Sequence, residues 1–186
     1  MTLVIRPRAE SVEGQPILRP LPSAKCRSVG PFVFFDHMLK TDYAPGHGMD
    51  IRQHPHIGLS TLTYLFEGEL LHKDSLGSEQ RVKPGEVSWM TAGAAVAHIE
   101  RTPADLLEQG SRLHGLQVWL ASPKHAEQGP GHYSHHRADS LPLSQALGVS
   151  IRMIAGNGFC LESPVPVLSP TLYAEVRMQA ATTLCI

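Results

Sequence analysis

The stretch that decides the fold is DIRQHPHIGLSTLTYLFEGE, residues Asp50–Glu69. Its second half is rich in β-branched and aromatic residues, which is typical of a strand. The tripeptide EGE at residues 67–69 interrupts this pattern as a turn would, and LLHKD then resumes it. We therefore expect a β-hairpin, entered by a segment in which a proline separates two histidines, His54 and His56.

Short strand patterns and turn residues recur along the rest of the chain. Residues 80–100, QRVKPGEVSWMTAGAAVAHIE, repeat the hairpin arrangement around Pro84-Gly85, and a short strand follows the breaker Gly93. Alternating patterns also predict strands in LHGLQVWLAS (113–122), GVSIRMIAGNGF (148–159) and TLYAEVRM (171–178), whereas PADLLEQGSRL (103–113) suggests a short helix. Short strands spaced about 8 to 12 residues apart indicate an all-β sandwich or barrel.

One segment lacks an apolar pattern. Residues 121–142, ASPKHAEQGPGHYSHHRADSLP, are polar and contain Gly, Pro and Ser throughout. We expect a linker or an extended surface loop here. The histidines in it are expected to be solvated: His125, His132, His135 and His136.

Composition excludes several classes of protein. Sixteen Lys plus Arg against seventeen Asp plus Glu leave a net charge of -1, so no overall field attracts nucleic acid or an anionic membrane. No apolar run approaches the roughly 18 residues that span a bilayer, and the start MTLVIRPRAE lacks a signal-peptide core, so we expect a cytoplasmic protein. The cysteines are odd in number and far apart, which argues against a disulfide framework: Cys26, Cys160 and Cys185.

Two pairs of residues could carry chemistry. Side chains at i and i+2 of a strand share one face, so His54 and His56 would point the same way, and His98 and Glu100 would do so on a second strand. If those strands face each other across a barrel, three imidazoles and one carboxylate converge, a set that suits a divalent transition metal. Each pair alone fits a second interpretation, as ordinary polar residues in a chain with eleven histidines.

The remaining histidines and the large aromatics have structural interpretations beside functional ones. His37, His47 and His72 fit surface positions better than a supporting role beside a metal ligand. His114 lies inside a strand pattern and could point either way. Core or rim packing is the simplest role for the aromatic residues Trp89, Phe34, Phe35 and Trp119.

An ordered set of motifs resembles a known family. GPFVFFDHM, HPHIGLSTLTYLFEGELLHKDSLG and VKPGEVSWMTAGAAVAHIE closely resemble the pirin family of the cupin superfamily, and the later PTLYAEV resembles the family's entry into its second domain. The resemblance runs from about Val29 to Arg177. It implies cupin (jelly-roll-like) β-barrels, the N-terminal one of which carries a single metal, commonly iron, bound by three His and one Glu.

By motif position, the resemblance places these ligands on His54, His56, His98 and Glu100. Ser60 stands near the position where the wider cupin pattern has a glutamate, so a fourth ligand must come from Glu100. Iron(II) is the expected metal, and Mn, Ni, Cu or Zn would suit the same ligands.

The chain departs from the family in length, since a typical pirin continues through a complete second barrel. We expect an N-terminal metal-binding cupin barrel over residues 1–122, a linker or surface loop over 123–147 and an incomplete second cupin barrel over 148–186. The last strands cannot close a barrel alone. We expect them to pair onto the first barrel or to expose an edge that another subunit covers.

The resemblance leaves two classes of function open. Some bacterial pirins resemble quercetin 2,3-dioxygenases, which open the central ring of a flavonol with dioxygen and release carbon monoxide; Glu100 would then hold the metal and accept the flavonol's hydroxyl proton. Animal pirins resemble redox-sensitive transcriptional cofactors, in which the iron's oxidation state alters contact with a protein partner. The short chain adds a third interpretation, a protein that keeps its metal with little activity. None of these predicts direct contact with nucleic acid.

Overall fold

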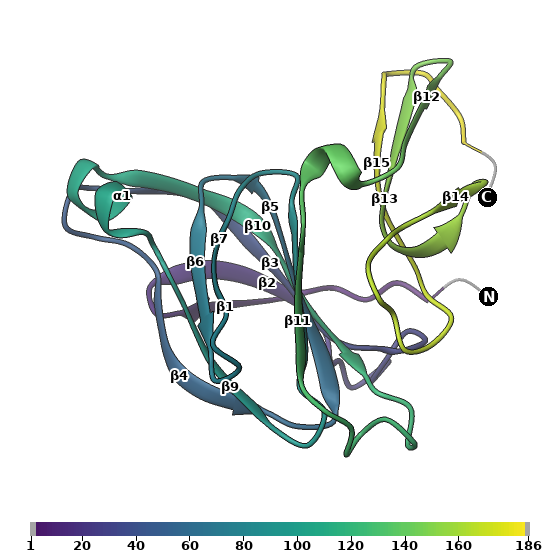
Figure 1. Cartoon of the computed structure of the whole chain (residues 1–186). Coiled ribbons are helices and arrows are strands. Elements are labelled where there is room, and N and C mark those ends of the chain that lie inside the picture. The colour runs from purple at the N-terminus through teal and green to yellow at the C-terminus, as the bar shows by residue number, and fades with distance from the viewer. Residues whose placement is uncertain (1–2, 185–186) are drawn as a thin grey trace.

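The computed structural model describes residues 3–184, and these residues form an all-β protein (Figure 1). The strands are β1 (Arg8–Val12), β2 (Gln15–Leu21), β3 (Phe32–Tyr43), β4 (Asp50–His56), β5 (Leu59–Glu67), β6 (Leu70–Asp74), β7 (Glu79–Val82), β8 (Val87–Thr91), β9 (Val96–Arg101), β10 (Ser111–Ala121), β11 (His132–His136), β12 (Leu143–Ala146), β13 (Val149–Gly158), β14 (Leu161–Glu162) and β15 (Leu172–Met178). Two short helical segments accompany them: α1 (Ala104–Gln109) and the 3-10 turn η1 (Ala138–Ser140). The expected fold class is confirmed.

The strands form three sheets. The largest has seven strands in the order β1-β2-β3-β10-β5-β8-β11, and we call it sheet A. Sheet B has four strands in the order β4-β9-β6-β7, and the third sheet contains β12, β13, β14 and β15. Every pairing between these strands is antiparallel. Figure 1 shows the third sheet, in green to yellow, beside sheets A and B.

Sheet A is covered on both faces, which explains why β5 is buried over six consecutive residues. Alternate residues of β5 serve different cores. Leu62 and Tyr64 pack with Ile154 of the third sheet. Leu65 packs instead with Leu70 of sheet B. Thr63, between Leu62 and Tyr64, points toward sheet B, where its hydroxyl contacts Glu100 of β9.

The expected hairpins around residues 67–69 and 84–85 are wrong. β5 pairs with β8 and β10 in sheet A, whereas β6 pairs with β7 and β9 in sheet B. The chain crosses between the sheets again from β7 to β8 and from β8 to β9. Turn residues mark where a strand ends, but they do not determine whether the next strand returns beside it or enters the facing sheet.

The polar segment 121–142 is only partly a loop. His132–His136 forms β11 and pairs along its whole length with β8 at the edge of sheet A. His135 and His136 are half-buried as a result, so the expectation that both are solvated is wrong, as is that of an irregular segment at 132–136. A strand that pairs through its backbone needs little apolar content of its own. The division into domains 1–122 and 148–186 stays a prediction.

Two smaller expectations are confirmed. The helix suggested in PADLLEQGSRL is α1, which begins after Pro103 and ends before Gly110. The pattern TLYAEVRM forms β15. No helix within residues 3–184 is both long and apolar enough to cross a membrane. Cys26 is half-buried and Cys160 exposed, neither in a disulfide, and Cys185 lies outside the described residues.

Candidate metal centre

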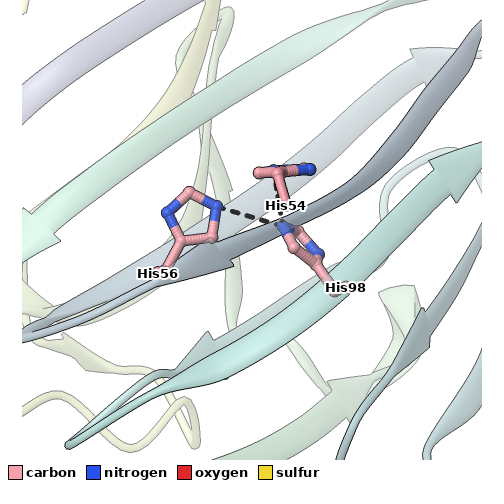
Figure 2. Close-up of side chains that lie close together, drawn as sticks. All are labelled: His54, His56 and His98. Carbon is pink, nitrogen blue, oxygen red and sulfur yellow. Dashed lines mark hydrogen bonds between the residues drawn. The ribbon is translucent and has the colours of Figure 1, made fainter.

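The predicted histidines lie together on the inner face of sheet B, on the neighbouring strands β4 and β9 (Figure 2). His54 is directly opposite His98, and their Nε2 atoms are 3.0 Å apart. The Nε2 atom of His56 is 3.1 Å from that of His98. The three side chains can place one nitrogen each within 4.8 Å of one another. The expectation that the two strands face each other across a barrel is wrong, because β4 and β9 are hydrogen-bonded neighbours.

An irregularity in β4 turns its histidines inward. Ile51 is opposite Glu100, but the next registered pair is His54 with His98, so β4 has one residue more than β9 over this interval. Without this bulge, Ile51 and His54 would point to opposite faces. With it, Ile51 packs on the core between the sheets and the ring of His54 reaches the same interior.

Backbone and burial prepare these rings to act as neutral ligands. His54 Nδ1 lies 2.8 Å from the carbonyl oxygen of Arg52, so it donates a hydrogen bond and leaves the lone pair on Nε2. Burial, together with a smaller effect of the neighbouring imidazoles, lowers the pKa of His56 to about 4 and that of His98 to about 3. Protons therefore compete weakly with a metal for these two nitrogens near neutral pH.

Glu100 is buried on β9 but is held apart from the three-histidine group. One carboxylate oxygen accepts a 2.8 Å hydrogen bond from Thr63, and the other lies 3.5 Å from Nε2 of Gln117. Glu100 belongs to a second group of candidate ligands, which it forms with His72 and His98. His98 is thus common to both groups.

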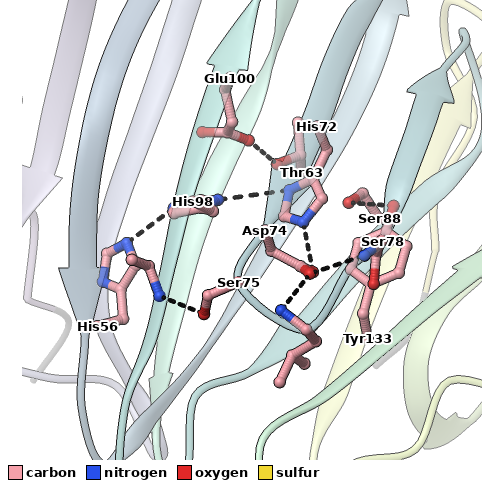
Figure 3. Close-up of polar contacts among 12 residues, drawn as sticks. His56, Thr63, His72, Asp74, Ser75, Ser78, Ser88, His98, Glu100 and Tyr133 are labelled. Carbon is pink, nitrogen blue, oxygen red and sulfur yellow. Dashed lines mark hydrogen bonds and ion pairs between the residues drawn. The ribbon is translucent and has the colours of Figure 1, made fainter.

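His72 is the main residue that sequence reasoning misplaced. It was expected at the surface, but it is 2% exposed on β6, next to β9. Its Nε2 atom is 3.0 Å from a carboxylate oxygen of Asp74, and its ring stacks on Tyr133 of β11 (Figure 3). The i, i+2 spacing of His72 and Asp74 repeats that of the two predicted pairs, and this spacing could have identified them as site residues. No such spacing marks three further residues near the site: Thr63, Gln117 and Tyr133.

Aromatic side chains form one wall of the site. The ring of Trp119 on β10 meets that of His56 edge to face, with the centroids 4.9 Å apart. Phe34 stacks on Trp119 at 4.0 Å. Trp89, in contrast, is 1% exposed in the core between sheet A and the third sheet, and Phe35 packs against the same core. Trp89 and Phe35 therefore have a packing role only, whereas Trp119 also lines the site.

Other histidines lie elsewhere. His37 and His114 form a half-buried pair with their Nε2 atoms 2.9 Å apart, and burial lowers the pKa of His37. His47 and His125 are exposed, as is His132. His135 lies 3.2 Å from the carboxylate of Glu86.

The donor set fits a divalent transition metal. Neutral imidazoles, with at least one Nε2 lone pair directed into the group, are borderline ligands for such ions. Nε2 atoms only 3.0 to 3.1 Å apart need a shared proton or a cation between them. A carboxylate two residues from His98 can lower the net charge of an occupied site.

Comparisons with known proteins agree in family and fold. A family model described as Pirin matches residues 14–120. A pirin-like protein of Caulobacter vibrioides is 43% identical over 99% of this chain and 65% of its own length. A putative quercetin 2,3-dioxygenase of Pseudomonas aeruginosa is 36% identical over 95% of this chain and 54% of its own. The crystal structure of a quercetin 2,3-dioxygenase from Acinetobacter baumannii superposes with a TM-score of 0.87 at 33% identity, covering 93% of this chain and 56% of that one. The chain thus spans between about half and two thirds of the length of these proteins.

Proposed function

The chain belongs to the pirin family of the cupin superfamily, and we propose that it binds one divalent transition metal and acts as a quercetin 2,3-dioxygenase-type oxygenase on flavonols. The observation that carries the proposal is the convergence of His54, His56 and His98 through their Nε2 atoms. The family membership and the similarity to quercetin 2,3-dioxygenases support the substrate class. Dioxygen is the second substrate.

The proposed ligands are the three histidines and Glu100, and iron(II) is the proposed metal, although Mn, Ni, Cu or Zn suits the same donors. A bound metal would supply Lewis-acid binding of the flavonol's 3-hydroxyl as an anion, which activates the ring toward oxygen. The lowered pKa values of His56 and His98 keep both rings neutral, so that one nitrogen of each carries no proton and can bind a metal.

Glu100 is the proposed acceptor of the hydroxyl proton. Glu100 is 5% exposed, and its carboxylate is oriented by the Thr63 hydroxyl and the Gln117 amide. A base oriented in this way can take a proton from a substrate atom about 3 Å away. Trp119, stacked on Phe34, places an aromatic wall beside His56, which suits an aromatic substrate.

The test begins with elemental analysis of protein purified without added metal. Metal-loaded protein is then expected to consume quercetin absorbance with stoichiometric uptake of oxygen. His56→Ala should abolish both, whereas His47→Ala, at an exposed histidine, should leave both intact. Metal-loaded protein that shows no turnover would contradict the proposed activity. Metal retention without turnover would favour the alternative, a regulator that binds a protein partner according to the metal's redox state.

A further inference from the structure

The second ring nitrogen of His98 has a specific partner. The Nδ1 atom of His98, which faces away from His54 and His56, lies 3.3 Å from Nδ1 of His72 (Figure 3). Two imidazole nitrogens at this distance need one proton between them, since two lone pairs would repel and two N–H groups would clash. The residue that carries this proton determines what His98 presents to a metal through Nε2.

The contact with Asp74 determines which nitrogen of His72 carries a proton. One of its oxygens, Oδ1, accepts hydrogen bonds from the amides of Leu76 at 2.9 Å and Ser78 at 3.0 Å, so the turn after β6 holds the carboxylate in place. The other oxygen, Oδ2, lies 3.0 Å from His72 Nε2. The Asp74 side chain is 0% exposed and that of His72 is 3% exposed, so water does not replace this contact. A carboxylate only accepts, and Nε2 of His72 therefore carries a proton.

The tautomer of His98 follows from that of His72. With Nε2 protonated, a neutral His72 has its lone pair on Nδ1, where it accepts the N–H of His98 Nδ1. The lone pair of His98 is then on Nε2, the atom that lies 3.0 Å from His54 Nε2 and 3.1 Å from His56 Nε2.

We propose that Asp74 and His72 are positioning residues that fix the tautomer and the ring orientation of His98, so that its Nε2 lone pair faces the metal position. This inference rests on the proposed metal site. A metal-bound imidazole usually has such a partner for its other nitrogen. His54 obtains the same effect locally, from the carbonyl of Arg52, whereas His98 depends on a chain of contacts through β6.

Further contacts hold Asp74 and His72 in position beside His98. The amide of Ser75 donates to the carbonyl of Ala97 at 2.8 Å, and the amide of Ala97 donates to Ser75 Oγ at 3.1 Å. The turn that holds Asp74 is thereby tied to the residue preceding His98. On the other side, Tyr133 covers the face of the His72 ring at 4.4 Å with an angle of 17° between the planes. Little freedom remains for the His72 ring to rotate.

The first experiment reads the tautomers directly in wild-type protein loaded with diamagnetic Zn²⁺, because without a cation the closely spaced Nε2 atoms would share a proton. Long-range ¹⁵N–¹H spectra of the histidine rings are expected to show His98 protonated at Nδ1 and His72 protonated at Nε2. His98 protonated at Nε2 would overturn the proposal. This measurement needs no substitution, so it remains decisive even if a variant fails to fold.

The second experiment compares Ni²⁺ affinity, measured by titration calorimetry, among matched variants. His72→Phe keeps the stacking on Tyr133 but removes the acceptor, and it should weaken binding by about 10- to 100-fold and give His98 a mixture of tautomers. His72→Gln offers a carbonyl acceptor and should recover most of the affinity. His47→Phe, the same change at an exposed histidine, should have no effect.

The outcomes separate this proposal from the proposed function. If His72→Phe binds Ni²⁺ as tightly as the wild type with an unchanged His98 spectrum, the positioning role is refuted. If His72→Gln binds as weakly as His72→Phe and the calorimetry gives two Ni²⁺ sites in the wild type, His72 is itself a ligand and the role is also refuted. A wild type that binds Ni²⁺ through the three histidines but does not turn over quercetin refutes the oxygenase activity and leaves the positioning role supported.

Discussion

His54 on β4 lies directly opposite His98 on β9, with 3.0 Å between their Nε2 atoms. The candidate centre is therefore built on two hydrogen-bonded strands of one sheet, and the separation of these histidines is set by the sheet itself. Neighbouring strands are about 4.8 Å apart, which places opposite side chains within reach of a single ion. A site supported in this way needs little rearrangement to bind a metal.

Acid should destabilise the metal-free protein. The pKa values of His56 and His98 are lowered in the folded state by burial, whereas in the unfolded chain they return to their ordinary value of 6.5. Below pH 6.5 the unfolded state therefore binds more protons, and the free energy of unfolding falls as the pH falls, by up to about 1.4 kcal/mol per pH unit for each histidine. Denaturant unfolding between pH 7.5 and 5, after treatment with a chelator, measures this slope.

A control separates these histidines from others whose pKa values burial also lowers, namely His37, His135 and His136. His56→Asn should reduce the slope by about one proton's contribution. His47→Asn, at an exposed position, should leave the slope unchanged. If the free energy of unfolding has the same pH slope in the wild type and both variants, the assignment of a lowered pKa to His56 is contradicted.

Glu100→Gln should impair both metal binding and turnover. The substitution keeps the shape of the side chain and its contact with Thr63 but removes the negative charge and the basic oxygen. We expect Ni²⁺ affinity to fall about 10-fold or more, and quercetin turnover to fall about 100-fold or more. Glu162→Gln, at an exposed glutamate of β14, is the matched control. Unchanged affinity with reduced turnover would leave Glu100 as the base alone, and two unchanged values would exclude both roles.

Gly68→Ala should be far more destabilising than Gly77→Ala. Both glycines have positive φ, +81° and +90°, so an alanine at either is strained by about 1 to 2 kcal/mol. At Gly68, where the chain crosses from sheet A to sheet B, an added Cβ would also lie 1.8 Å from the carbonyl oxygen of Arg112. At Gly77 it would meet nothing within 4 Å. Thermal unfolding of both variants tests this, and equal losses would show that the crossing is not closely packed.

The third sheet should associate with a second copy of the chain. β15 pairs with β13 along one side, and apolar side chains on it are exposed: Leu172, Val176 and Met178. An exposed edge strand with apolar side chains is a template for further pairing. Light scattering across a dilution series should show a dimer that dissociates on dilution and is weakened by Val176→Lys. A monomer at every concentration would contradict this prediction.

Much of the fold could be predicted because its signals are local. β-branched and aromatic residues between turn dipeptides predict the strands, and the short helix α1 follows from PADLLEQ. Residues two positions apart on a strand share one face, so His54 lies with His56, and His98 lies with Glu100. These relations hold whichever strands become neighbours.

Pairing between distant strands could not be predicted in the same way. The EGE turn ends β5, but the chain then enters the facing sheet. β11 joins sheet A through its backbone, although its sequence resembles a polar loop. His72 resembles a surface histidine until β6 lies beside β9 and Tyr133 covers its ring.

The sequence by itself determined the all-β class, the pirin resemblance and the two-residue spacing of His54 with His56 and of His98 with Glu100, because each is carried by short stretches of the chain. Only the tertiary structure decided that β4 and β9 are neighbours and that a bulge turns His54 inward. It also decided that His72, which contacts Asp74, is the partner of His98 Nδ1. The physical reason is that register and sheet membership are set by the burial of apolar faces contributed by many distant segments. No local pattern specifies that choice.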